Sequence, residues 1–191
     1  MMNLADILKL LYFVSIIVWI FPAIRNYKGE FFDFFLILAL IDPIAIIYGL
    51  LTKTSIPGWL TVLFVYLLII SLLSEEKIKN LKYILIFFPL FFVVLIPFLE
   101  KKHLLITIII ECSIVFLFFL KFLIVDYVNN KRIKLFFLML VFYELTVILK
   151  FFNIIIGFAD AYGFYIVTSI AQIIFGLFFS IVREDESGVI I

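Results

Sequence analysis

The sequence predicts an all-α, polytopic membrane protein: one transmembrane domain of seven helices over residues 1–191, with the amino terminus outside and the carboxyl terminus inside. Hydrophobic residues make up 67% of the chain, against about half in soluble domains, and the mean hydropathy is +1.34. Apolar runs of roughly 20 residues, enough to cross a bilayer, alternate with short connections. We expect contact with the lipid bilayer, no soluble domain, and a place in the inner (cytoplasmic) membrane of a bacterium.

The expected helices follow the apolar runs. They cover about 5–24, 31–51, 57–73, 81–99, 104–125, 135–157 and 162–182. The first is expected to be an uncleaved helix, because no small-residue cleavage site follows its apolar region. It ends at Pro22 and a polar loop, and Trp19 and Tyr27 are placed like interfacial anchors.

The second expected helix contains Asp42 near mid-membrane, directly before Pro43. Proline removes a backbone donor and biases the preceding residue away from ideal helix geometry. Two interpretations remain open. Asp-Pro forms a structural kink, which we favour, or Asp42 belongs to a polar site.

The third and fourth expected helices carry no charge and are interpreted as lipid-facing or packing elements; Pro89 bends the fourth. In the fifth, Glu111 lies one turn after Thr107 on the same face. Cys112, the single cysteine, excludes an intrachain disulfide and is expected to be a small packing residue. The single histidine, His103, is expected in a loop beside Lys101 and Lys102.

The sixth expected helix carries polar residues inside a long apolar run, and an unpaired charge at membrane depth costs several kcal/mol. Its polar positions Tyr143, Thr146, Lys150, Asn153 and Gly157 recur at spacings of three and four and share a stripe about 80° wide. Glu144 points roughly 140° away from that stripe. This helix therefore needs partners on two sides and is expected inside the bundle.

The seventh expected helix follows a short loop, so it should be the antiparallel neighbour of the sixth. Its polar and small residues fall within about 120° of arc. They are Tyr162, Tyr165, Thr168, Ser169, Gln172, Gly176 and Ser180. We call the meeting of the two stripes the polar seam, lined by Lys150, Asn153, Tyr165, Ser169 and Gln172 with Glu111 opposite. It is either a close helix interface, in which Gly157, Ser169 and Gly176 let the backbones approach, or the wall of a polar cavity; we favour the interface.

Orientation follows from the distribution of lysine and arginine over the connections. Nine lie on the side of the carboxyl terminus and four on the other, which places the carboxyl terminus in the cytoplasm. By depth, Lys150 and Glu111 both fall in the outer half, so Glu111 is the expected partner of Lys150, with Asp160 as the second choice. Asp42 and Glu144 have no nearby cation, so at least one should be protonated or hydrogen-bonded to hydroxyl groups.

Several function classes lack the residues that they require. The net charge of +1 gives no basis for nucleic-acid binding. One histidine cannot supply a zinc-protease cluster or a bis-histidine haem site, no GxSxG motif is present, and the seventh helix has no lysine for retinal. We expect no catalytic residues, no metal, no cofactor and no enzymatic activity. The candidate ligand- or ion-binding residues are Lys150, Glu111, Glu144, Asp42, Asn153, Gln172, Tyr165 and Ser169.

The segment FPAIRNYKGE resembles the proline-containing turn of the PQ-loop transporters, which also have seven helices. Ala23 stands in place of the glutamine of that motif, and the fifth expected helix has no matching proline. The size and apolarity are also similar to those of substrate-binding subunits of vitamin uptake systems. Neither resemblance assigns a family.

The function expected from these observations is that of a sensory or accessory membrane subunit. It would recognise something in the outer half of the bundle and act through a partner membrane or cytoplasmic protein. The alternative is a small secondary transporter or solute-binding subunit, in which Asp42, Glu111 and Glu144 are proton or ion sites.

Overall fold

The computed structural model describes residues 4–184 and 188–189. In this part of the chain the seven expected helices are present. They are α1 (Leu4–Arg25), α2 (Phe32–Thr52), α3 (Gly58–Ser71), α4 (Glu75–Leu95), α5 (Lys101–Asn130), α6 (Leu135–Ile156) and α7 (Ala161–Ile181), with a short 3-10 helix, η1 (Ile96–Phe98), after α4. Six of the seven are long and apolar enough to cross a membrane, whereas α3 is a shorter apolar helix of 14 residues. These helices are typical of an integral membrane protein.

Two helices extend well beyond the apolar runs that predicted them. α4 begins at Glu75, six residues before the expected start, and α5 has 30 residues. Hydropathy marks the apolar part of a helix, whereas Glu, Lys and Gln are good helix formers that continue it into water. His103 consequently lies in the first turn of α5, exposed, and not in the expected loop.

The connection between α6 and α7 is held at both of its ends. α6 ends at Gly157 in the left-handed conformation (φ 67°), which glycine adopts without strain. The Asn153 side-chain oxygen accepts a hydrogen bond from the backbone N–H of Ala159 at 2.9 Å. Asp160 caps α7 by accepting from the N–H of Gly163 at 2.7 Å. The short connection makes α6 and α7 antiparallel neighbours, as predicted.

The structure adds one element that the all-α prediction lacks. β1 (Ile133–Lys134) pairs antiparallel with β2 (Gly188–Val189), with Ile133 opposite Val189 and Lys134 opposite Gly188. Next to it, the Lys134 ammonium lies 3.4 Å from Asp126 of α5. Gly188 and Val189 are thereby attached to the α5–α6 connection.

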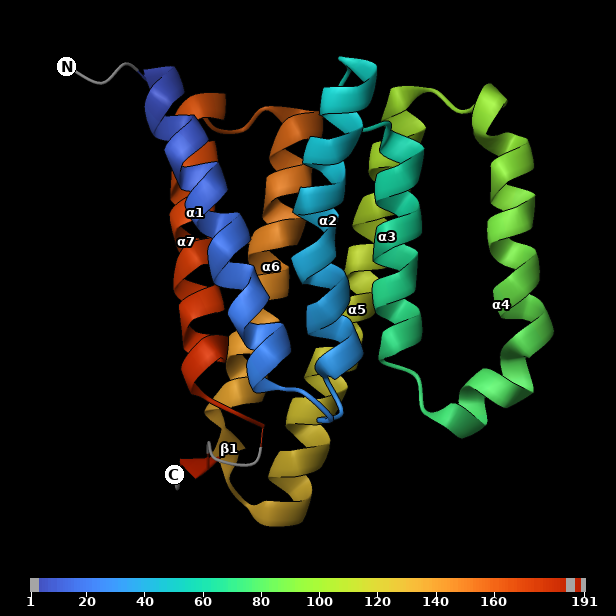
Figure 1. The fold of residues 1–191 in the computed structure, drawn as a ribbon. Coiled ribbons are helices and arrows are strands. Elements are labelled where there is room, and N and C mark those ends of the chain that lie inside the picture. The colour runs from blue at the N-terminus through green and yellow to red at the C-terminus, as the bar shows by residue number, and fades with distance from the viewer. Residues whose placement is uncertain (1–3, 185–187, 190–191) are drawn as a thin grey trace.

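Six helices form the bundle, and α4 lies outermost (Figure 1). α1 packs between α7 and α2, and α5 packs between α3 and α6. α4 contacts α3 through Tyr66, whose hydroxyl donates to the Leu85 carbonyl at 2.8 Å and whose ring stacks on Phe88 at 5.1 Å between centroids. Most of its other large apolar side chains are exposed, as in a helix that faces lipid.

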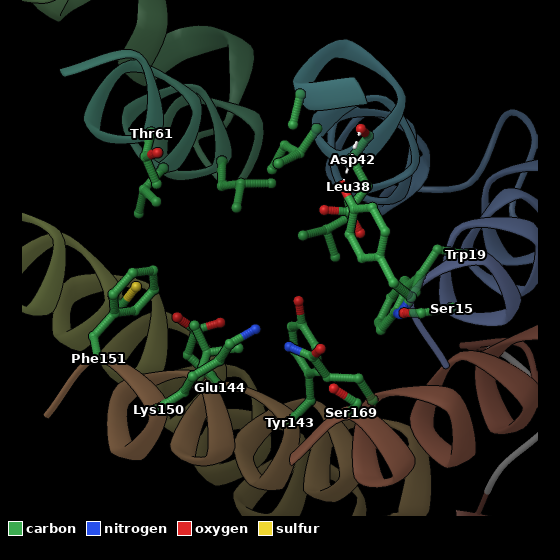
Figure 2. A pocket seen from close by; sticks show the side chains of 18 of the residues that line it. Ser15, Trp19, Leu38, Asp42, Thr61, Tyr143, Glu144, Lys150, Phe151 and Ser169 are labelled. Carbon is green, nitrogen blue, oxygen red and sulfur yellow. Dashed lines mark hydrogen bonds between the residues drawn. The ribbon is translucent and has the colours of Figure 1, made fainter. Parts of the chain in front are cut away.

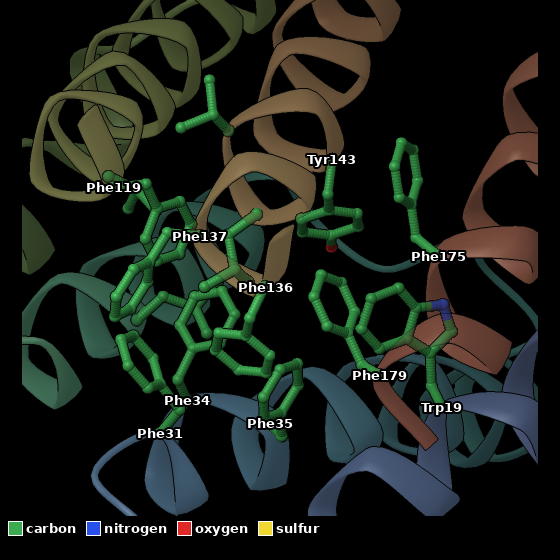
Figure 3. Close-up of a cluster of buried hydrophobic side chains, with 14 of the residues drawn as sticks. Trp19, Phe31, Phe34, Phe35, Phe119, Phe136, Phe137, Tyr143, Phe175 and Phe179 are labelled. Atoms are coloured by element: carbon green, nitrogen blue, oxygen red, sulfur yellow. The ribbon is translucent and has the colours of Figure 1, made fainter. Parts of the chain in front are cut away.

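The end of the bundle opposite the amino terminus is filled by aromatic side chains, which we call the aromatic cluster (Figure 3). They come from the starts of α2 and α6, the middle of α5 and the end of α7. The members that are 3% exposed or less are Phe31, Phe34, Phe35, Phe119, Phe136 and Phe179. Their rings meet mostly edge to face or tilted, such as Phe34 on Phe119 at 5.2 Å, which is the favourable arrangement for aromatic pairs.

Trp19 and Gly176 do not occupy the places expected from the sequence. Trp19 is 6% exposed and its ring lies 4.9 Å from that of Tyr143, so it is a core residue and not an interfacial anchor. A Cβ on Gly176 would lie 2.7 Å from Cγ1 of Val18. Gly176 therefore permits the close approach of α7 to α1, and not the approach of α6 expected from the polar stripe. Hydropathy alone cannot tell which helix a small residue faces.

Candidate functional site

The other half of the bundle contains a cavity of about 360 Å³ between α1, α2, α3, α5, α6 and α7 (Figure 2). Its charged side chains are Asp42, Glu144 and Lys150. Its wall also contains hydroxyl, amide, thiol and aromatic groups. These belong to Tyr12, Ser15, Trp19, Thr61, Cys112, Tyr143, Phe151, Tyr165, Ser169 and Gln172.

Four of the five residues predicted to line the polar seam lie in the cavity wall: Lys150, Tyr165, Ser169 and Gln172. The fifth, Asn153, is buried and bonds the α6–α7 connection instead. Thr168, on the same helix as Ser169, satisfies its hydroxyl locally by donating to the Phe164 carbonyl. Along α6 and α7 the seam is therefore a cavity wall and not the close helix interface that we favoured.

Glu144 and Lys150 both reach the cavity, although they point in different directions on α6. The Glu144 side chain is 3% exposed and lines the cavity together with Cys112 of α5. The Lys150 ammonium lies over the ring of Tyr165 on α7, 5.3 Å from the centroid, in a cation–π arrangement. The prediction that α6 needs partners on two sides is met by α5 and α7.

The expected ion pair between Lys150 and Glu111 is not formed. Both carboxylate oxygens of Glu111 are buried, and neither has a hydrogen-bond partner among the described residues. The second expected partner, Asp160, caps α7. Depth along the membrane predicted that Glu111 and Lys150 lie at similar heights, but it says nothing about the direction in which each side chain points around its helix.

Asp42 contributes the third charged side chain of the cavity from α2, and Figure 2 shows it across the cavity from Lys150. Its backbone carbonyl accepts a long hydrogen bond, 3.5 Å, from the hydroxyl of Tyr12 on α1. Pro43 lies inside α2 and Asp42 lies in the polar wall of the cavity, whereas the structural kink at Asp-Pro stays a prediction. Within the described chain, neither Asp42 nor Lys150 forms a salt bridge.

Cys112 combines packing with a polar contact. It is 1% exposed and belongs to a small cluster of buried apolar residues with Val62, Val65 and Ile108, as expected of a packing residue. Its thiol also faces Glu144 at the edge of the cavity. In the described segments no group of three or more histidine, cysteine, aspartate or glutamate residues could hold a metal ion.

The sequence analysis missed the contributions of α1 and α3. Tyr12, Ser15 and Trp19 line the cavity from α1, and Thr61 lines it from α3. The spacing of three and four between the α1 residues places them on one face of the helix. That spacing was a usable signal, because polar and aromatic residues at such intervals in an aliphatic span mark an inward face.

The aromatic cluster closes one end of the cavity. Trp19 and Tyr143 belong to both, because they line the cavity and pack against the phenylalanine rings. The Trp19 ring lies 6.3 Å from that of Phe179. At its other end the cavity reaches Ile56 in the α2–α3 connection, on the side of the bundle where the chain begins (Figure 1).

Apolar helices around a charged internal cavity are the features of a helical integral membrane protein with an internal polar site. This chain matches no protein-family model, no curated protein and no solved structure.

Proposed function

We propose that this chain is a non-enzymatic sensory or accessory subunit of a membrane, which binds a small polar solute in the cavity and acts through a partner protein. The observation that carries the proposal is the cavity itself. Charges of both signs, Asp42 and Lys150, face one cavity between apolar helices without pairing with each other. Ionisable groups inside membranes are costly, and they mark binding sites and pathways by default.

The position of the cavity supports recognition from one side of the membrane. It lies in the half of the bundle that contains the amino terminus, and the aromatic cluster fills the other half. The distribution of lysine and arginine favours an amino terminus outside the cell, which makes this the outer half. The solute then arrives from outside, and the densely packed inner half transmits its presence without opening.

The composition of the wall supports binding over catalysis. A hydrolase or transferase requires a nucleophile with a base beside it. The single histidine, His103, is exposed on α5, away from the cavity. Among the described residues no hydrogen bond joins the serines of the wall, Ser15 and Ser169, to Asp42, Glu144 or Lys150, the groups of the wall that could act as a base. A partner membrane or cytoplasmic protein would therefore carry the output.

Glu111 favours a second candidate, a small proton-coupled transporter. Its buried and unpartnered carboxylate is adjacent in sequence to Cys112, which lines the cavity together with Glu144. A buried carboxyl group with unused acceptors is suited to take up a proton. In that case the aromatic cluster would have to open during the transport cycle.

The test is purification from native membranes in a gentle detergent, followed by mass spectrometry of the proteins and small molecules that co-elute. The proposal predicts a bound solute together with a stoichiometric partner that carries a regulatory or enzymatic domain. Uptake of a solute by vesicles containing the purified chain alone would contradict it and support the transporter. Vesicles containing the Glu111→Gln variant are the matched sample, since only proton-coupled transport should depend on that carboxyl group.

A further inference from the structure

The charges of the cavity are arranged as a separated pair. The carboxylate of Asp42 projects from α2, and the ammonium of Lys150 projects from α6 on the opposite wall (Figure 2). Glu144 also lines the cavity, beside Cys112. Lys150 lies on the face of the Tyr165 ring. Asp42 and Lys150 thus face the cavity from opposite walls with opposite charges and form no ion pair in the described chain.

Such a separation is unfavourable in an empty site. Two opposite charges in a low-dielectric interior gain most when they touch, and each remains costly when it does not. A compact ligand that carries its own charges of both signs would satisfy both groups at once. A simple amine would satisfy Asp42 only, and a simple acid would satisfy Lys150 only.

The rest of the wall suits the cationic end of such a ligand. Tyr12 and Trp19 of α1 and Tyr143 of α6 line the cavity together. Aromatic rings attract ammonium groups through their faces, and rings with a carboxylate nearby are a common setting for ammonium recognition. Around Lys150, the amide of Gln172 and the hydroxyl of Ser169 supply hydrogen-bond donors from α7.

We propose that the cavity binds a small zwitterion, with its ammonium group toward Asp42 and its anionic oxygen group toward Lys150. The inference rests on the proposed function and names its ligand class. The cavity volume of about 360 Å³ is near the lower end of the range of about 300–1,000 Å³ for ligand pockets, which suits a molecule of amino-acid size. The same chemistry is present in the headgroup of a zwitterionic lipid, so the ligand is either a free zwitterion or such a headgroup.

The experiment uses the purified full chain and a series of amino acids of increasing length. Glycine, β-alanine, γ-aminobutyrate and 5-aminovalerate move the ammonium away from the carboxylate one methylene at a time. Each is compared with the amine and the acid of the same chain length by calorimetric titration. We expect one member to bind about tenfold or more tightly than its matched amine and acid, because each of these lacks one charged hydrogen bond.

A second experiment with lipids distinguishes a free zwitterion from a zwitterionic lipid headgroup. The chain is placed in nanodiscs of phosphatidylethanolamine and, separately, of phosphatidylglycerol, and the bound lipid is measured by mass spectrometry. Retention of one phosphatidylethanolamine per chain, with no binding of free amino acids, supports the zwitterion as a headgroup. Binding of a free amino acid in either nanodisc supports the soluble form.

Variants test whether the ammonium group of the ligand lies toward Asp42 and its anionic group toward Lys150. Lys150→Met should abolish the preference for the zwitterion over the matched amine, and Asp42→Asn should abolish the preference over the matched acid. Lys121→Met and Asp33→Asn are the controls. Both residues carry the same charge as the residue they are matched with, and both side chains are exposed on a helix of the bundle. If a cavity variant does not fold, titration of the unmodified chain with the amino acids, amines and acids still decides whether the cavity prefers a zwitterion.

The outcomes distinguish this inference from the proposed function. Equal or tighter binding of amines or acids overturns the zwitterion, but it leaves a solute-binding cavity in place. No binding of any compound or lipid in the panel, with no small molecule retained from native membranes, overturns both.

Discussion

The polar cavity and the aromatic cluster occupy successive halves of the same bundle and share Trp19 and Tyr143 as their boundary. The cluster is filled by rings that are almost wholly buried, whereas the cavity keeps about 360 Å³ of space beside Asp42 and Lys150. In the cluster, shape complementarity between rings supplies the stability. In the cavity, the space and the unpaired charges reduce stability. The comparison shows that one half of this bundle is filled by packed rings and that the other half contains a charged cavity.

The largest expected effect concerns the cluster. Phe34→Ala should destabilise the protein by about 3–5 kcal/mol, the usual cost of removing a buried phenylalanine, because Phe34 is fully buried against Phe35 and Phe119. Thermal unfolding in detergent measures this loss. Phe87→Ala is the control, since Phe87 is 68% exposed on α4. Equal effects of the two substitutions would show that the cluster does not supply the stability of the bundle.

The α1–α7 contact comes next, because it holds the first helix of the cavity wall in place. Gly176→Ala should cost about 1–3 kcal/mol, since the new methyl group overlaps Val18. The double variant Gly176→Ala/Val18→Ala should recover part of this loss by removing the methyl group that is overlapped. Chemical or thermal unfolding of the single and double variants measures the coupling. Additive losses would mean that α1 and α7 do not approach as closely as described.

A smaller effect is expected at the edge of the cavity. Cys112→Ala removes a buried thiol beside Glu144 and should cost about 1 kcal/mol, the order expected for the loss of one buried group. Cys112→Ser keeps a donor of similar size and should cost less. Unfolding midpoints of both variants provide the comparison. A larger loss with serine than with alanine would show that packing, and not the contact with Glu144, determines the residue at this position.

The smallest effect on stability is expected in the cavity itself. Lys150→Met removes a charge that has no salt bridge in the described chain, so the unfolding temperature should stay the same or rise. The Lys121→Met variant is measured beside it as a lysine outside the cavity. A marked loss of stability for Lys150→Met alone would mean that the ammonium has a structural partner, as the pairing with Glu111 required.

The sequence predicted the helices because each is an apolar run, and six of the seven have the length of a membrane span. It predicted the α6–α7 wall because a short loop makes those helices neighbours. The contact of α1 with α7 joins the two ends of the chain, and no local pattern indicates it. For that reason Trp19 was assigned to the interface and Gly176 to the wrong partner helix. Asp42 and Lys150 face each other from helices that are not consecutive, so depth alone predicted the wrong carboxylate for Lys150. The number of membrane crossings and their orientation stay predictions.

The most direct test of the account is cysteine labelling in vesicles of known orientation. In a Cys112→Ser background, Gln172→Cys places a thiol in the cavity wall and Phe179→Cys places one in the aromatic cluster. A small charged thiol reagent is applied to one face of the membrane at a time. The account predicts that Gln172→Cys reacts from the face of the amino terminus only, and that Phe179→Cys reacts from neither. Labelling of Gln172→Cys from the opposite face, or equal labelling of both positions, would contradict a cavity that the aromatic cluster closes.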